Sequence, residues 1–216
     1  MPLSYIWRAG SSHGVVMIVK RVFDLVVAAV AGIVLSPLLV LLAVMVRGKL
    51  GRPVLFTQER PGLHGRPFTL LKFRTMTNER GSDGALLPDD ERLPPFGRFL
   101  RSTSLDELPE LWNVIRGDMS LVGPRPLLMA YLDRYSPRQA RRHEVRPGIT
   151  GWGQVNGRNA PSWQERLEMD VWYVENRTFW LDFRILLRTI VAVVRRDGVT
   201  ADGHATVPYF PGNEGV

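Results

Sequence analysis

Two adjacent carboxylates, Asp106 and Glu107, stand in the segment "LRSTSLDELP", which runs from Leu100 to Pro109. A carboxylate can act as a nucleophile that forms a covalent phosphoryl or glycosyl intermediate. Two neighbouring carboxylates can also bind a hard cation such as Mg²⁺ through oxygen. A glycosidase is a poor fit, because its two carboxylates stand across the scissile bond, about 5 Å or more apart, whereas neighbours on one helical turn point in different directions.

A structural role accounts for the same pair. Ser104 and Glu107 match a capping box, in which the glutamate folds back onto the serine amide. Acidic residues in a first helical turn also suit the macrodipole. Pro109 complicates this interpretation, because it would remove a helix hydrogen bond, so the cap could instead be Leu105 or Asp106. These residues alone leave chemistry and helix capping both open.

Phosphoryl transfer also needs cations that spread the charge of the transferring group. Arg125 lies between two prolines in "GPRP", and Lys72 stands near the end of a predicted strand. Arg101 precedes Asp106 by less than two helical turns, and Arg158 lies in "NGRN". Each cation alone is more often a solvated surface charge. Their occurrence together with the acidic pair favours a phosphate site.

Composition narrows the class of protein. A chain of 216 residues with 45% hydrophobic residues fits one domain, or one domain plus an appendage. The net charge of +7 favours anionic partners: nucleic acid, phosphorylated substrates or an acidic membrane surface. The lack of cysteine excludes disulfides, thiolate metal sites and a cysteine nucleophile. The four histidines are not closely paired, so a histidine zinc site is not expected.

An uncharged apolar segment, "LVVAAVAGIVLSPLLVLLAVMV", fills Leu25 to Val46 and predicts insertion into a membrane. A run of about 20 apolar residues is long enough to cross a bilayer as a helix. It starts too late and is too long for a cleaved signal peptide. Basic residues flank both ends, so the positive-inside rule assigns no orientation to a spanning helix. The flanking residues are Lys20, Arg21, Arg47, Lys49 and Arg52.

Ser36 and Pro37 interrupt this apolar segment. Pro37 cannot donate to the carbonyl of Ile33, so the helix is expected to bend there. Ser36 could satisfy a backbone group that the proline leaves free. A kinked spanning helix and a re-entrant segment that enters and leaves on one side both remain open.

Beyond residue 52 the pattern predicts one α/β unit that is mostly α-helical. "PVLFTQERPGLHGRPFTLLKF" predicts two short strands around a glycine-rich turn, and "NERGSDGALLPDDERLPP" predicts a loop. "RPGITGWGQVNGRNAP" contains too many glycines for either regular element and predicts a functional loop. Phe179 to Arg196 fits either a core helix or a helix at a membrane interface. Further helices are expected over Phe96–Arg101, Asp106–Arg116, Leu127–Tyr135, Pro137–Val145 and, after a capping box at Ser162 and Glu165, to about Asn176.

Several of these motifs together resemble the bacterial sugar transferases, the monotopic phosphoglycosyl transferases, and in particular their minimal, PglC-like members. The motifs are "KRVFDLVVAAVAGIVLSPLL", "LLKFRTM", "RSTSLDELPELWNVIRGDMSLVGPRPLL" and "RRHEVRPGITGWGQVNGRN". Their occurrence in this order makes the resemblance specific. It implies a re-entrant membrane helix (18–50) and a catalytic domain with a short β-hairpin and amphipathic interfacial helices (51–205). An N-terminal segment (1–17) and a tail (206–216) lie outside the resemblance.

The resemblance also implies a reaction. Asp106 would attack the β-phosphate of a UDP-sugar, expel UMP and hold the phosphosugar as an acyl phosphate, which a polyprenol phosphate would then accept. Glu107, together with Asp106, would bind Mg²⁺, and Arg125 would contact phosphate. Lys72, Arg101 and Arg158 match basic positions near the family's site. The sugar is left open, since no residue indicates an N-acetylated amino sugar such as diacetylated bacillosamine over another.

The implied location is the cytoplasmic face of the bacterial inner membrane, in monotopic form, with a UDP-sugar, an undecaprenyl-type polyprenol phosphate and the bilayer as partners and no nucleic acid. The alternative is a membrane-anchored basic module that binds anionic lipid or nucleic acid without catalysis. Its binding would depend on salt and not on Asp106 or Glu107.

Overall fold

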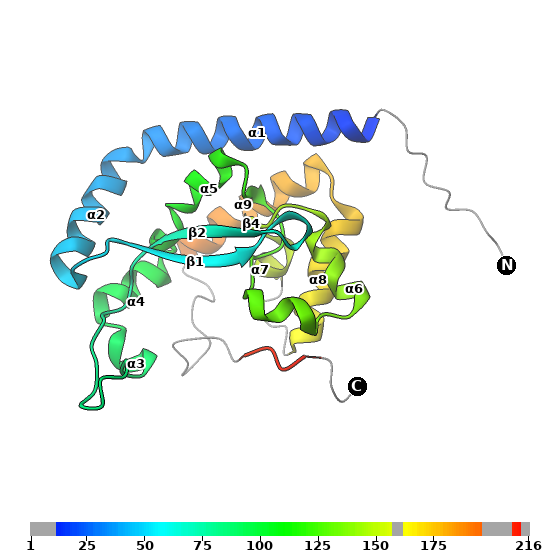
Figure 1. Ribbon diagram of the computed structural model, residues 1–216. Coiled ribbons are helices and arrows are strands. Elements are labelled where there is room, and N and C mark those ends of the chain that lie inside the picture. The colour runs from blue at the N-terminus through cyan, green and yellow to red at the C-terminus, as the bar shows by residue number, and fades with distance from the viewer. Residues whose placement is uncertain (1–11, 157–161, 196–208, 213–216) are drawn as a thin grey trace.

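The computed structural model describes residues 12–156, 162–195 and 209–212, which form mostly helices and two small two-stranded sheets (Figure 1). This confirms the prediction of a mostly helical chain with a short β-hairpin. The helices are α1 (Ser12–Val34), α2 (Ser36–Leu50), α3 (Asp89–Arg92), α4 (Pro95–Ser102), α5 (Glu110–Arg116), α6 (Pro137–Ala140), α7 (Trp152–Asn156), α8 (Trp163–Asn176) and α9 (Phe179–Arg195). The strands are β1 (Leu55–Pro61), β2 (Pro67–Phe73), β3 (Ser120–Val122) and β4 (Gly148–Thr150). The 3₁₀-helices are η1 (Leu63–Gly65), η2 (Leu105–Glu107), η3 (Met129–Arg134) and η4 (Arg141–Glu144).

The apolar segment bends where the sequence predicts. α1 ends at Val34, α2 begins at Ser36, and the two helices are bent by 63°. The Ser36 hydroxyl donates to the carbonyl of Ile33 at 2.7 Å, which confirms that serine satisfies the group that Pro37 cannot reach. Among the described residues, no single helix has the length and hydropathy to cross a bilayer, whereas this bent pair meets both requirements together.

Buried polar contacts hold the first half of α1 against the rest of the protein. Asp24 is 3% exposed and accepts a hydrogen bond from the Ser120 hydroxyl at 2.7 Å. Lys20 forms an ion pair with Asp182 of α9. Arg21 donates to the carbonyl of Ile115, the residue before the last one of α5, at 3.2 Å. Because buried polar groups that lose their partners are costly, these contacts fix the helix on the domain that it precedes.

The predicted hairpin is present. β1 and β2 pair in antiparallel register from Leu55 opposite Phe73 to Pro61 opposite Pro67. Asn113 of α5, which is fully buried, locks this hairpin to the helix. Its side chain accepts from the Leu71 N–H at 3.0 Å and donates to the Thr69 carbonyl at 2.7 Å. The position of β2, and with it that of Lys72, therefore depends on α5.

The prediction of a loop over "RPGITGWGQVNGRNAP" is wrong for its first part. Gly148–Thr150 forms β4, which pairs with β3 in parallel, and α7 follows directly. A Cβ atom at Gly148 would overlap the backbone nitrogen of Gly123, and one at Gly151 would overlap its carbonyl oxygen. Gly148 and Gly151 thus allow their backbone to lie directly against that of Gly123, rather than forming an open loop. Residues 157–161 of the segment lie outside the described residues.

The other helices follow the sequence with shorter extents. α4 confirms the helix expected over Phe96–Arg101. The helices expected near Leu127–Tyr135 and Pro137–Val145 are mostly single turns and 3₁₀ segments. The capping box that begins α8 is confirmed, since Ser162 and Glu165 exchange hydrogen bonds of 3.2 and 3.3 Å. The loop predicted after residue 78 contains one short helix, α3, near its end.

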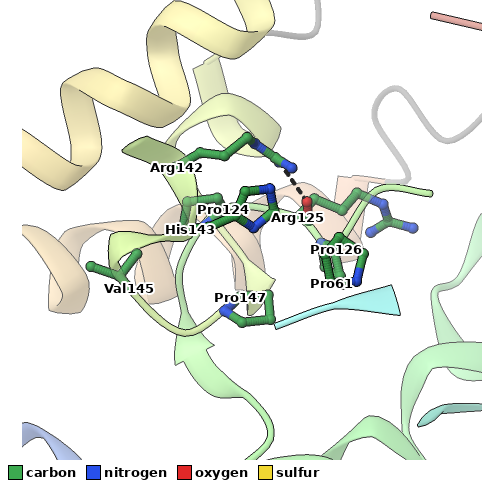
Figure 2. Close-up of a pocket in the computed structure, with 8 residues that line it drawn as sticks. All are labelled: Pro61, Pro124, Arg125, Pro126, Arg142, His143, Val145 and Pro147. Carbon is green, nitrogen blue, oxygen red and sulfur yellow. Dashed lines mark hydrogen bonds between the residues drawn. The ribbon is translucent and has the colours of Figure 1, made fainter. Parts of the chain in front are cut away.

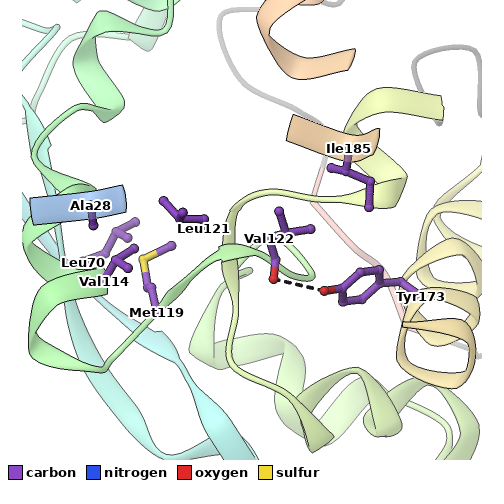
Figure 3. Packing of buried hydrophobic residues seen from close by; sticks show 8 residues of the cluster. All are labelled: Ala28, Leu70, Val114, Met119, Leu121, Val122, Tyr173 and Ile185. Carbon is purple, nitrogen blue, oxygen red and sulfur yellow. Dashed lines mark hydrogen bonds between the residues drawn. The ribbon is translucent and has the colours of Figure 1, made fainter. Parts of the chain in front are cut away.

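Two of the apolar clusters hold the helices and the hairpin together around the acidic pair. The central cluster joins α1, the hairpin, α5, β3, α8 and α9 (Figure 3). Its buried members are Ala28, Leu70, Val114, Met119, Leu121, Val122, Tyr173 and Ile185. A second cluster, called here the α2 cluster, joins α2 to β2, α4 and η2. Its buried members are Leu42, Val46, Leu50, Phe73 and Leu100, with Leu105 and Leu108 packed against them.

Candidate active site

The acidic pair lies on η2, between α4 and α5. Ser104 precedes η2 in the left-handed region, with φ of 54°, and makes no side-chain cap hydrogen bond. The capping-box interpretation of Ser104 and Glu107 is therefore wrong. A non-glycine residue with positive φ is uncommon, and such residues are often found near functional sites.

The single helix expected over Asp106–Arg116 is divided in two. α5 begins only at Glu110, and Pro109 occupies its N-cap position without a side-chain hydrogen bond. Neither Leu105 nor Asp106 caps the helix. Proline is tolerated at the start of a helix, where its missing N–H is not needed, so Pro109 separates the acidic turn from α5.

Glu107 is held by two of the predicted cations. Its Oε1 atom accepts from Lys72 Nζ at 2.7 Å and from Arg125 Nη2 at 2.6 Å. Burial by itself would raise the pKa of Glu107, but the charges of Arg125 and Lys72 outweigh it and lower the pKa to about 2. Glu107 in turn raises the pKa of Arg125 above its ordinary value. The structure thus brings Lys72, Glu107 and Arg125 together from β2, η2 and the GPRP loop.

Asp106, unlike Glu107, has no cation bound to its carboxylate among the described residues. Asp106 is 8% exposed, and no described side chain donates a hydrogen bond to its carboxylate. Burial, together with the neighbouring charge of Glu107, raises the pKa of Asp106 to about 6. At neutral pH the group is still ionised, and it is more basic than an ordinary aspartate. A carboxylate with free oxygen lone pairs and raised basicity is suited to act as a nucleophile.

A third carboxylate, Glu110, belongs to the same cluster and was missed in the sequence. Its side chain is 3% exposed, and Lys72 Nζ lies 3.1 Å from its Oε1 atom. Burial and the charge of Glu107 raise the pKa of Glu110 to about 7. The signal was available, because Glu110 follows Glu107 by three residues, a spacing that brings side chains together on a helical turn.

Arg101, Arg125 and Arg158, the other predicted cations, differ in their contacts with the three carboxylates. Arg101 donates to the hydroxyl of Thr75 at 3.0 Å, and its charge lowers the pKa that Asp106 would otherwise have. Arg125 keeps 44% of its side chain exposed, so it can reach a ligand as well as Glu107. Arg158 lies outside the described residues.

The GPRP loop that carries Arg125 borders a small hollow (Figure 2). Prolines from the hairpin, the GPRP loop and the segment before β4 line it together with side chains of η4. The lining residues are Pro61, Pro124, Arg125, Pro126, Arg142, His143, Val145 and Pro147. Burial lowers the pKa of His143 to about 4, so its imidazole is neutral at physiological pH.

A divalent cation fits the site only as a metal shared with a substrate. Within the described ranges, no three carboxylate or histidine side chains converge as ligands of a metal ion. Mg²⁺ commonly binds through one or two carboxylates together with substrate phosphates and water. The carboxylate of Asp106, which accepts no hydrogen bond from the side chains that the structure describes, is an oxygen donor of that kind. The second oxygen of Glu107, which accepts no hydrogen bond from a described side chain, is another.

Comparison with known proteins identifies the family. The sequence model described as bacterial sugar transferase matches residues 15–196. EpsL, an uncharacterized sugar transferase of Bacillus subtilis, is 55% identical over 200 residues, which are 93% of this chain and 99% of that protein. A UDP-galactose-lipid carrier transferase of Erwinia amylovora is 43% identical over 196 residues (83% of this chain, 41% of that protein). A UDP-glucose:undecaprenyl-phosphate glucose-1-phosphate transferase of Caulobacter vibrioides is 43% identical over 188 residues (82% of this chain, 70% of that protein).

The family match includes nearly all of α1, the acidic turn, the GPRP loop and all of α9. The chain corresponds to almost the whole of the Bacillus protein but to less than half of the Erwinia protein. The chain belongs to the bacterial sugar transferase family.

Proposed function

We propose that this protein transfers a sugar 1-phosphate from a UDP-sugar to a membrane polyprenol phosphate of the undecaprenyl type. The names of the Erwinia and Caulobacter relatives, which include a lipid carrier and undecaprenyl phosphate, support this assignment. The observation that carries it is the contrast between two adjacent carboxylates. Cations hold Glu107, whereas the buried Asp106 accepts no hydrogen bond from any side chain in the described ranges and has a raised pKa.

The reaction proceeds in two displacements at one phosphorus atom. An oxygen of Asp106 attacks the β-phosphorus of the UDP-sugar, and the bond from that phosphorus to the bridging oxygen breaks. UMP leaves with the electron pair of that bond, and an aspartyl phosphosugar remains. A phosphate oxygen of the polyprenol phosphate then attacks the same phosphorus, and the Asp106 carboxylate leaves, giving a polyprenyl diphosphate-linked sugar.

The cations stabilise the charge that the donor brings. Arg125 is partly exposed and offers the planar donor group that suits phosphate oxygens. Lys72 and Arg101 add positive charge on either side of the acidic turn, and Arg158 is proposed to approach the same phosphates. Glu107 orients Lys72 and Arg125 through the contacts described above. Fixed charges of this kind act where the transition state develops its charge.

Mg²⁺ is proposed to bind through Asp106 and Glu107 together with the donor's phosphate oxygens. When bound, it would neutralise diphosphate charge and help UMP to depart. The contacts of Glu107 to Lys72 and Arg125 leave its second oxygen for this role.

The bent helix pair is proposed to be a re-entrant element that dips into the cytoplasmic leaflet of the bacterial inner membrane. Large apolar side chains around the bend are exposed, and contiguous exposed apolar surface of this kind marks a membrane or partner site. They include Val26, Val30, Ile33, Val34, Val40, Leu41 and Val44. The outward side of α9 adds Trp180 (59% exposed) and Ile190 (60% exposed), while its Ile185 is buried, which fits an amphipathic helix at the interface.

The covalent step is tested with donor alone. Protein in lipid nanodiscs is incubated with a panel of UDP-sugars and Mg²⁺ but no acceptor, and UMP is measured. One UMP per protein is expected, and the tryptic peptide Ser102–Arg116 should gain the mass of a phosphosugar. Asp106→Asn should abolish both signals, whereas Asp133→Asn, at an exposed carboxylate, should leave them unchanged. Full activity of Asp106→Asn would overturn the mechanism, and salt-sensitive binding without any UMP release would support the binding module instead.

The topology has a separate test, because the chain contains no native cysteine. Single cysteines at Gly10 and Glu59 are labelled with an impermeant maleimide in right-side-out and inverted vesicles. A re-entrant segment predicts that both sites react in the same vesicle orientation. Reaction of the two sites in opposite orientations would show a spanning helix.

A further inference from the structure

Arg142, in η4, is a buried cation that the proposed reaction does not use. Its residue is 2% exposed. Its Nε and Nη2 atoms donate to Asp170 Oδ2 at 3.1 and 2.7 Å, and Nη1 donates to the Tyr135 hydroxyl at 3.3 Å. Asp170 lies on α8, so the ion pair joins the segment after the GPRP loop to a long, well-capped helix.

The same guanidinium holds the backbone of a phosphate-site residue. Arg142 Nη2 also donates to the carbonyl oxygen of Arg125 at 2.6 Å, the contact drawn in Figure 2. The Arg125 side chain extends away from Arg142 in that view, and its far end reaches Glu107 at 2.6 Å. A continuous series of contacts therefore runs from Asp170 through Arg142 and Arg125 to the acidic turn.

The GPRP loop depends on such outside contacts. Pro124 and Pro126 have no N–H groups, so the backbone around Arg125 can make few hydrogen bonds of its own. The carbonyl of Pro124 accepts from the Gly148 N–H at 3.0 Å, and that of Arg125 accepts from Arg142. Both anchors come from other parts of the chain. The loop's position is thus set by β4 on one side and by Arg142 on the other.

We propose that Arg142, oriented by Asp170, is a positioning residue that fixes Arg125 for contact with Glu107 and with the donor's diphosphate. This inference rests on the function proposed above. A buried ion pair by itself contributes little net stability, because desolvation offsets the attraction. The third partner of Arg142 is the backbone oxygen of Arg125, so the ion pair also fixes the position of the GPRP loop. A displacement of about 1 Å at a reacting centre can cost up to about a hundredfold in rate.

A double-mutant cycle tests this assignment. Arg142→Lys keeps the charge but cannot maintain three directed contacts at once, and it is measured alone and together with Arg125→Ala. We expect Arg142→Lys to lower kcat/KM for the UDP-sugar about tenfold in the parent protein and less than about twofold in the Arg125→Ala background. Asp170→Asn should behave in the same way, and it provides a second route if the lysine variant does not fold.

The burst of UMP separates positioning from folding. Its amplitude counts folded, competent sites, whereas its rate reports how well each site is arranged. We expect a slower burst with unchanged amplitude; a lower amplitude with an unchanged rate would show a merely structural role and overturn the proposal. Arg141→Lys is the matched control, since the neighbouring Arg141 pairs with Glu144 and Glu175 on the surface and neither ion pair involves the GPRP loop.

The remaining outcomes are also decisive. Equal losses in both backgrounds would show that Arg142 does not act through Arg125, and this inference would fail while the proposed function stands. If the parent protein releases no UMP from any donor, the proposed function fails and this inference fails with it.

Discussion

Replacing Asp106 with asparagine should stabilise the folded protein at neutral pH while it abolishes the proposed reaction. Burial, reinforced by the charge of Glu107, raises the pKa of Asp106 from 3.8 to about 6. The residue is 8% exposed, so little of this shift is lost to solvent screening. About 2 pKa units correspond to roughly 3 kcal/mol of folding free energy. Asparagine has nearly the same shape and no charge, so it should remove this cost.

The pH dependence of the effect follows from the direction of the shift. Below about pH 4, Asp106 is protonated in both the folded and the unfolded chain and costs nothing. The cost grows as the pH rises from about 4, the pKa in the unfolded chain, to about 6, the pKa in the folded one, and it is constant above that range. The difference in free energy of unfolding between Asp106→Asn and the parent should therefore be near zero at pH 4 and about 3 kcal/mol at pH 7.5.

Thermal melting in lipid nanodiscs measures this difference, with EDTA present so that no metal ion alters the titration. For a chain of this size, 1 kcal/mol shifts Tm by about 2–4 °C, so Asp106→Asn should melt about 6–12 °C higher at pH 7.5. Asp133→Asn, at an exposed carboxylate, should melt like the parent at both pH values. If Asp106→Asn melts no higher than the parent at pH 7.5, or if the difference does not change with pH, then Asp106 is not destabilised by burial and the account of its reactivity is wrong.

Three further predictions follow from described contacts. The kcat/KM for UMP release should rise about tenfold from pH 5 to pH 7, because this ratio reports the free protein, in which the fraction of ionised Asp106 rises through a pKa of about 6; a flat profile would contradict this. Pro37→Leu restores a donor for the carbonyl of Ile33, so it should straighten the 63° bend and change which vesicle orientation exposes the label at Glu59. Gly97→Ala should lower Tm, because the added Cβ atom would overlap the carbonyl oxygen of Thr75. Gly48→Ala lies in α2 with open space around it, so it should raise the free energy of unfolding by about 0.5–1 kcal/mol.

Local chemistry explains what the sequence predicts correctly. The bend at Ser36 and Pro37, the hairpin and the capping box of Ser162 each depend on residues close together in the chain, and the structure confirms all three. Lys72, Arg125 and the acidic pair were predicted from residue type and rigid setting. The structure shows that Lys72 and Arg125 meet on Glu107.

Long-range packing explains the rest. The parallel pairing of β3 with β4 joins two strands of three residues each that are distant in the chain. Nothing local in the glycine pattern of "RPGITGWG" distinguishes a close backbone approach from a loop. The capping box at Ser104 was wrong because cations from β2 and the GPRP loop hold Glu107 more strongly than a serine amide would. Asn113 was not singled out, since its role depends on backbone groups of a strand more than 40 residues earlier.

The α2 cluster has a consequence for how this protein can be handled. Leu42, Val46 and Leu50 of α2 cover one side of Phe73 and Leu100, and the leucines on both sides of the acidic pair pack against the same cluster. A truncation that starts after residue 51 would uncover these side chains and remove the packing that supports the acidic turn. Helix α2 is therefore a structural support of the turn that carries Asp106, and we expect a displacement of α2 to move that turn as well.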